Sequence, residues 1–269
     1  MTMAIRIDRV TRAFGETVAL SEISLTIPDG QFVSLVGPSG CGKSTLLAII
    51  AGLDPATTGR VEVGSTPGVV FQEPALFPWR NIRDNVAFGP EMQGVKKAER
   101  YSRADAALRM VHLTRFAHAF PHQLSGGMRQ RAAIARALVS DPAVLLMDEP
   151  FAALDAQTRT LLQAELLTVW ERTRKTVVFV THALDEALYL SDRIILMSAR
   201  PGRVLADLTV DAPRPRDPQA DPALASLRAH LLALLSAEVE ALARAEHDGD
   251  WQGLARPAPP ATANIGAEI

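Results

Sequence analysis

A run of nine residues at positions 37–45 has the glycines, lysine and serine of a loop that binds phosphate groups. It reads G-P-S-G-C-G-K-S-T and matches the pattern G-x-x-x-x-G-K-S. Gly40 and Gly42 leave space for phosphate oxygens to approach backbone N–H groups. We expect Lys43 to contact the terminal phosphates of a nucleoside triphosphate and the hydroxyl of Ser44 to bind Mg²⁺. The candidate nucleotide ligands in this loop are Gly37, Pro38, Ser39, Gly40, Cys41, Gly42, Lys43, Ser44 and Thr45.

Two acidic residues, Asp148 and Glu149, directly follow the apolar run A-V-L-L-M at 143–147. Acids at the end of an apolar strand are poorly explained as a solvated turn. Because a phosphate loop lies upstream, Asp148 is the candidate ligand of Mg²⁺. Glu149 is the candidate general base for an attacking water, a role that typically accelerates a reaction about 10²- to 10⁴-fold.

A parallel sheet is needed to bring these groups together. Residues 33–36 predict a strand that leads into the phosphate loop, and residues 44–51 predict a helix that follows the loop and ends at Gly52. The short apolar runs at 143–147, 177–180 and 194–197 are typical of buried parallel strands. Helical stretches separate them. The fold class is therefore α/β, with a mostly parallel sheet flanked by helices.

Two further units are predicted around this core. Apolar alternation and turn residues within 4–35 indicate strands, which we assign to an N-terminal antiparallel β subdomain. Helical segments rich in Ala, Arg and Leu run from about residue 96 to 140 and indicate a helical subdomain, inserted at about 90–140. We assign residues 1–210 to one nucleotide-binding domain.

The C-terminal part has a different pattern. Four prolines within 211–222 predict a linker, and leucines from Leu224 onward recur at helical spacing, so a helix is expected over 223–246. We expect this helix to pack on the surface of its own domain. The alternative, a helix lying on a membrane, is less favoured because the polar face is mixed rather than basic. Residues 247–269 predict a disordered tail.

Composition and charge narrow the functional classes. The 269 residues include 28 basic and 30 acidic side chains, giving a formal net charge of −2, which argues against a nucleic acid as ligand. A single cysteine excludes an intramolecular disulfide. The apolar runs are shorter than the roughly 20 residues that span a bilayer, and no signal peptide is expected at residues 1–10. Work at a membrane would therefore need a partner.

Residues 124–131 read L-S-G-G-M-R-Q-R and resemble the signature sequence of the ABC ATPases. Further matches follow in the order of that family: Phe14 as the aromatic residue that stacks on adenine, Gln72, residues 153–155 (A-L-D), and His182. The resemblance, over about residues 4–210, implies a P-loop ATPase core, ATP and Mg²⁺ as cofactors, and catalytic roles for Gln72, Glu149 and His182. It also implies Ser44, Gln72 and Asp148 as metal ligands.

The same resemblance implies a homodimer. In the family, the signature residues of one subunit contact the nucleotide that the other subunit binds. For this chain those signature residues are Ser125, Gly126 and Gly127, and the resemblance implies Asp155, of the motif 153–155, as a further nucleotide-binding residue. A helix that begins at the signature would offer N–H groups to a γ-phosphate. Two nucleotides would then lie between two head-to-tail copies.

Three segments resemble the branch of importers for nitrate, sulfonates and taurine: residues 71–79, 85–89 and 198–203. The implied partners are membrane permease subunits and, indirectly, a solute-binding protein, which places the chain peripherally on the cytoplasmic face of a prokaryotic plasma membrane. We expect Leu76, Phe77 and Trp79 to contact the permease, although Trp79 fits a core position as well. Residues 61–70 are shorter than is usual in the branch and predict a trimmed hairpin.

Three functions are alternatives to an import ATPase. The first is a soluble ABC ATPase that acts on DNA or ribosomes. It would need an insertion or a charge that is absent here, since only residues 73–124 separate Gln72 from Ser125. The second is a nucleotide-binding regulator without turnover. Such a protein should lack Glu149 or His182, whereas both are present in this chain. The third is an exporter, and the identity of the solute stays open.

Overall fold

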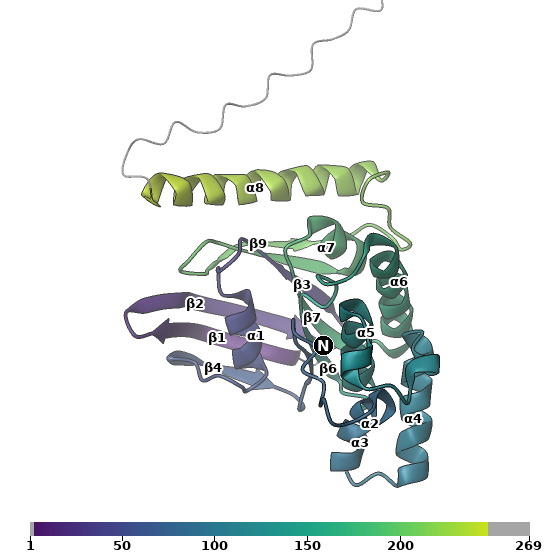
Figure 1. Ribbon diagram of the computed structural model, residues 1–269. Coiled ribbons are helices and arrows are strands. Elements are labelled where there is room, and N and C mark those ends of the chain that lie inside the picture. The colour runs from purple at the N-terminus through teal and green to yellow at the C-terminus, as the bar shows by residue number, and fades with distance from the viewer. Residues whose placement is uncertain (1–2, 247–269) are drawn as a thin grey trace, which may run out of the picture.

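The computed structural model describes residues 3–246, with the side chains of 3–240, and a six-stranded sheet forms its centre (Figure 1). The strand order is β5-β6-β7-β3-β8-β9, in which β9 alone runs antiparallel to its neighbour. Both faces of this sheet are covered, so every residue of β3, β6 and β7 is buried. The strands are β3 (Phe32–Val36), β5 (Gly68–Val70), β6 (Val144–Asp148), β7 (Thr176–Thr181), β8 (Arg193–Met197) and β9 (Val204–Thr209).

A second sheet is antiparallel and three-stranded, with the order β2-β1-β4. Its strands are β1 (Met3–Phe14), β2 (Thr17–Pro28) and β4 (Thr58–Val63). Residues that alternate along β1 and β2 pack with the apolar side of α1 (Lys43–Ile50) against one face of the large sheet. The α/β core and the antiparallel N-terminal sheet predicted from the sequence are confirmed.

Helices cover the opposite face of the large sheet. Phe32 and Phe179 point to this face, whereas their neighbours Val33 and Val178 point to the α1 side, because successive residues of a strand alternate. Helices α2 to α5 are inserted between β5 and β6, and α6 joins β6 to β7. Their bounds are α2 (Ile82–Val86), α3 (Phe88–Met92), α4 (Lys97–Met110), α5 (Gly126–Leu138) and α6 (Ala156–Thr173), with 3-10 turns η1 (Thr114–Phe116) and η2 (Pro121–Gln123).

The segment 61–70 contains no hairpin, so that expectation was wrong. β4 pairs with β1 in the small sheet, and β5 pairs with β6 in the large sheet. The N–H of Gly64 still donates to the carbonyl of Ala4 at 2.9 Å, which extends the small sheet by one residue. The residues 65–67 then cross directly to the edge of the other sheet, and so short a connection leaves no length for two paired strands.

Helix α8 (Pro222–Glu246) lies along one end of the molecule, next to α7 (Leu184–Leu190) (Figure 1). Leu224 and Leu231 are buried in a cluster with residues of α7 and β8, while Val239 is exposed. The helix is long and apolar enough to cross a membrane by length and composition over Pro222–Glu240. Leu227, Leu234 and Leu235 pack against the same cluster, so this side of the helix lies on the domain as the spacing of the leucines predicts. The tail expected at 247–269 lies outside the described residues.

Candidate functional site

The carboxyl ends of β3, β6 and β7 meet at one edge of the large sheet, where ligands of open α/β sheets bind. A cleft of about 640 Å³ opens there, between this edge and the small sheet. Ten of the predicted site residues line it: Phe14, Ser39, Gly40, Gly42, Lys43, Ser44, Thr45, Gln72, Glu149 and His182. The described cleft thus joins residues that are far apart in the chain, from Phe14 near the N-terminus to His182.

The phosphate loop leaves the first turn of α1 open toward the cleft. Gly42 caps this helix with φ 97° and has no side chain that could accept a hydrogen bond from the N–H groups of the first turn. A Cβ at Gly42 would lie 2.6 Å from Cδ2 of Leu20, so a larger residue would be strained and would clash. The free N–H groups and the helix dipole favour an anion at this position.

Lys43 lies inside the loop and is buried. Its ammonium group donates to the carbonyl oxygens of Gly37 and Pro38, both at 2.8 Å. These bonds hold the positive charge at the centre of the loop, next to the open N–H groups. Gly37, Pro38 and Cys41 belong to the loop but do not line the cleft, and Cys41 is 1% exposed.

Ser44 and Asp148 form the candidate metal site. The Ser44 hydroxyl donates to Oδ1 of Asp148 at 3.0 Å. Burial raises the pKa of Asp148 above its usual value, and the hydrogen bond from Ser44 opposes that rise. Both residues offer oxygen, the donor that Mg²⁺ prefers, and Gln72 adds an amide oxygen in the same cleft. This donor set fits Mg²⁺, which usually completes its shell with water and phosphate oxygens.

Glu149 and His182 face each other across the end of the cleft. Nδ1 of His182 lies 3.2 Å from Oε2 of Glu149. Glu149 follows β6 with φ 43°, a left-handed conformation that is uncommon for a residue with a side chain, and its N–H donates to the carbonyl of Val180 at 3.0 Å. The backbone after β6 therefore turns Glu149 away from the direction of Asp148.

Phe14 ends β1 at the mouth of the cleft, and its side chain is 50% exposed. The guanidinium of Arg12 lies 4.3 Å from the centre of its ring and is itself held by Asp54 at 2.6 Å. Arg12 occupies one face of the ring. A planar base can then stack on the other.

The remaining predicted ligands, Ser125, Gly126, Gly127 and Asp155, do not line this cleft. Ser125 caps α5 and accepts a hydrogen bond from the N–H of Met128 at 3.3 Å; Asp155 caps α6 and accepts one from Thr158 at 2.9 Å. A Cβ on Gly127 would lie 3.0 Å from Leu154, so the starts of the two helices are neighbours. They form a second polar edge of the chain, apart from the cleft.

The residues that follow Gln72 form an exposed aromatic surface. Trp79 is 72% exposed, so the alternative of a core position is wrong. The ring of Phe77 packs against Trp79 at 5.6 Å and against Phe88 at 4.6 Å, and a groove of about 580 Å³ runs along this surface to Arg136. The guanidinium of Arg136 donates to the carbonyls of Ala75 at 2.7 Å and of Pro74 at 2.9 Å.

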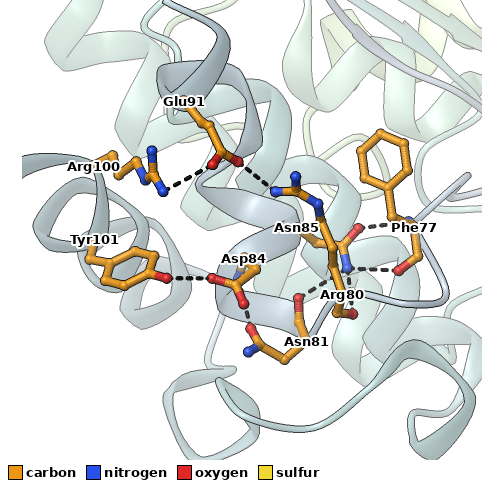
Figure 2. A network of polar contacts seen from close by, with 8 residues as sticks. All are labelled: Phe77, Arg80, Asn81, Asp84, Asn85, Glu91, Arg100 and Tyr101. Atoms are coloured by element: carbon orange, nitrogen blue, oxygen red, sulfur yellow. Dashed lines mark hydrogen bonds and ion pairs between the residues drawn. The ribbon is translucent and has the colours of Figure 1, made fainter. Parts of the chain in front are cut away.

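A buried amide fixes the start of this surface, as Figure 2 shows. Oδ1 of Asn85 accepts a hydrogen bond from the N–H of Phe77 at 2.7 Å, and Nδ2 donates to the carbonyls of Phe77, Arg80 and Asn81. Arg80 in turn pairs with Glu91 at 2.5 Å. The aromatic side chains are therefore presented by a rigid turn and not by a loose loop.

Three residues that line the cleft were not identified from the sequence as site residues: Thr17, Ala19 and Arg200. Arg200 belongs to the segment 198–203, which was read only as a mark of family branch. A signal was available, since residues that follow β8 lie at the same sheet edge as residues that follow β3.

Comparison with known proteins gives a consistent result. Residues 20–152 match the ABC transporter family. An uncharacterised ABC transporter ATP-binding protein of Methanocaldococcus jannaschii is 51% identical over 81% of this chain and 86% of its own. The aliphatic sulfonates import ATP-binding protein SsuB of Granulibacter bethesdensis is 48% identical over 91% and 99%, respectively. Further relatives are named as taurine and nitrate import ATP-binding proteins.

Among solved structures, a dimeric ATP-binding cassette in a post-hydrolysis state, bound to ADP and Pi, resembles this chain. The TM-score is 0.71 at 36% identity, and the match covers 77% of this chain and 99% of the cassette.

Proposed function

We propose that two copies of this chain hydrolyse MgATP to drive the import of a small anion through separate membrane subunits. The premise is that the chain belongs to the family of ATP-binding subunits of ABC transporters and is an ATPase. The observation on which this proposal chiefly rests is the Glu149–His182 pair, 3.2 Å apart in the same cleft as Lys43 and Ser44. One cleft thus combines a phosphate-binding loop with a base and its partner.

The phosphate loop binds the triphosphate through the open N–H groups of α1 and through Lys43. Ser44, Asp148 and Gln72 hold Mg²⁺, which when bound neutralises charge on the β- and γ-phosphates. Phe14 stacks on the adenine ring, with Arg12 supporting its other face. These contacts hold the terminal phosphate at the inner end of the cleft, next to Glu149.

Glu149 accepts the proton of the attacking water as the oxygen of that water bonds to the γ-phosphorus. The bond between the γ-phosphorus and the bridging oxygen breaks, and ADP leaves with that oxygen. His182, through Nδ1, holds the Glu149 carboxylate and contacts the γ-phosphate region of the cleft. The left-handed backbone at Glu149 supports this role, since it directs the carboxylate toward the cleft while Asp148 remains at Ser44.

A second copy completes the site. The chain's own Ser125, Gly126, Gly127 and Asp155 lie away from its own cleft, so in a head-to-tail dimer they are free to contact the nucleotide of the other copy. The open N-terminal end of α5 suits the γ-phosphate of that nucleotide. Opening and closing of the dimer would then be linked to hydrolysis.

The membrane partner docks on the aromatic surface beside Gln72. Phe77 and Phe88 give the groove an apolar wall and Trp79 packs against Phe77 beside it, which is typical of a surface that receives another protein. We place the chain peripherally on the cytoplasmic face of the plasma membrane, with a solute-binding protein as an indirect partner. Nitrate, sulfonates including taurine, and similar anions are the proposed solutes.

The test is Mg²⁺-dependent ATP hydrolysis by the purified chain over a wide range of protein concentration. We expect the specific activity to rise with concentration and to fall by at least about 10²-fold in Glu149→Gln, which should accumulate as an ATP-bound dimer. Glu171→Gln, on the exposed side of α6, is the matched control and should keep full activity. A demonstrated monomer that hydrolyses at the full rate would refute the two-copy mechanism.

A further inference from the structure

The loop 198–203, between β8 and β9, is fixed against the phosphate loop. Gly202 forms backbone hydrogen bonds to both Ala19 and Ser21 of β2, at 2.9 and 3.0 Å. A Cβ on Gly202 would lie 2.0 Å from the carbonyl oxygen of Cys41, so the two loops are in contact at a point where only glycine fits. The position of this loop therefore follows that of the phosphate loop.

Internal bonds make the loop compact. The Ser198 hydroxyl donates to the carbonyls of Ala199 and Pro201 and accepts from the N–H of Arg203. On the outer side, the carboxylate of Glu238 in α8 accepts a hydrogen bond from the N–H of Ala199 at 3.1 Å. The backbone on either side of Arg200 is thus anchored from two directions, so its side chain starts from a defined place.

Arg200 is the residue of this loop that lines the nucleotide cleft. Nε of its exposed guanidinium lies 3.5 Å from the carbonyl oxygen of Gly40, a long contact that occupies one of five N–H donors. Within residues 3–240, whose side chains the structure describes, no carboxylate forms an ion pair with Arg200. The cleft therefore has a cation with free donors beside the phosphate loop, in addition to Lys43.

The chemistry of the ligand decides what this cation does. Lys43 is buried and already bonded to two carbonyl oxygens of its own loop. A triphosphate presents several oxygens with negative charge, and a guanidinium can bind two of them at once through its planar fork. Arg200 lies on the Gly40 side of the cleft, which Thr17 and Ala19 also line.

We infer that Arg200 is a nucleotide-binding residue, which leaves its contact with Gly40 and binds the phosphate chain of the bound nucleotide as a second cation. This inference rests on the proposed function, since it requires that the cleft binds a nucleoside triphosphate. It assigns a specific task to the segment 198–203, namely to hold a positive charge at the phosphate loop.

The test compares the affinities of the full-length wild type and three variants for ADP, by titration calorimetry without turnover. We expect Arg200→Gln to raise the Kd for ADP about tenfold, as for the loss of one charge-assisted hydrogen bond. Arg200→Lys should fall between, because it keeps the charge and loses the fork. Arg203→Gln removes the same charge from the same loop outside the cleft and should leave the Kd unchanged.

Adenosine separates a phosphate contact from a disturbed pocket, since it lacks phosphate. Competition by adenosine should be the same in Arg200→Gln and the wild type, and ADP binding should become less sensitive to salt in this variant. The inference is overturned if Arg200→Gln binds ADP as tightly as the wild type, if Arg203→Gln weakens binding equally, or if adenosine binding falls in parallel. If the wild type itself binds no nucleotide, the proposed function fails first.

Discussion

At the scale of single residues, the cleft depends on side chains whose neighbours set their position or their charge. Phe14 is exposed at the end of β1, and the guanidinium of Arg12 lies against one face of its ring. Arg12 is in turn held by Asp54, which follows α1 in the chain. The proposed stacking platform for the base is therefore built from the small sheet and from the segment after the phosphate-loop helix together.

Phe14→Ala should weaken the binding of ADP about tenfold, because stacking of a base on an aromatic ring contributes roughly 1–3 kcal/mol. Phe14→Trp keeps a planar ring and should bind nearly as well as the wild type. Titration with ADP checks both variants. Equal affinity of the alanine variant and the wild type would show that the ring is not a platform for the base.

Glu186 predicts an unusual dependence of stability on pH. Its carboxylate accepts from the hydroxyl of Thr181 at 2.7 Å and from Gln163 at 3.2 Å, and Arg159 and His182 face it. Burial raises the pKa of Glu186 despite these partners. A folded-state pKa above the unfolded value means that ionisation disfavours the fold, so the contribution of Glu186 to stability increases as the pH falls through the folded-state pKa.

Glu186→Gln should therefore be at least as stable as the wild type at neutral pH, and its advantage should shrink as the pH is lowered through the raised pKa. Thermal unfolding at a series of pH values checks this, with Glu171→Gln as an exposed control on α6. A glutamine variant that is less stable at neutral pH, and equal to the wild type in acid, would have the opposite sign and contradict the argument.

At the scale of elements, a short helix and a turn govern the aromatic surface. Helix α2 places Asn85 where one amide bonds to Phe77, Arg80 and Asn81, and Glu91 of α3 pairs with Arg80 and also with Arg100 of α4 (Figure 2). Three helices thus fix the segment that follows Gln72. We therefore expect a movement of Gln72 to displace these helices, and a movement of the helices to displace Gln72.

Asn85→Ala takes away the partner that Asn85 supplies to the N–H of Phe77 and to the carbonyl of Arg80, so it should lower the free energy of unfolding by about 2 kcal/mol. Asn85→Asp keeps the acceptor for the N–H of Phe77 but turns a carboxylate oxygen toward the carbonyls that the amide contacted, so it should be at least as destabilising as the alanine variant. Urea unfolding measures both. A loss below about 0.5 kcal/mol for the alanine variant would mean that water replaces the amide, and that the turn is not rigid.

At the scale of the whole molecule, the separation between the cleft and the second polar edge predicts how a substitution at that edge behaves. Ser125→Arg should leave the Kd for ADP within about twofold of the wild type, because Ser125 does not line the chain's own cleft. ATP turnover should fall by about 10²-fold or more, since the obstructed contact is to the phosphate of the other copy. Weaker binding of ADP by this variant would place Ser125 in its own site instead.

The sequence predicted those parts of the molecule in which local pattern and chemistry coincide. The phosphate loop lies between β3 and α1 because glycines, a buried strand and a helix start occur in order there. The path of residues 61–70 was missed, because the choice between a hairpin and a crossover depends on which sheet each strand joins. Arg200 was missed for a similar reason, since its place beside Gly40 follows from the pairing of β8 with β3.

The exposure of Trp79 also means that its fluorescence should change when another protein covers this surface. Indole fluorescence shifts to shorter wavelength when water is replaced by an apolar neighbour, and Trp79 is open to water whereas Trp170 is enclosed between the guanidinium groups of Arg174 and Arg214. If the proposed permease covers the aromatic surface around Trp79, the emission should shift to the blue, and Trp79→Phe should abolish that shift. Binding of the proposed membrane subunit could then be followed by intrinsic tryptophan fluorescence, without an added label.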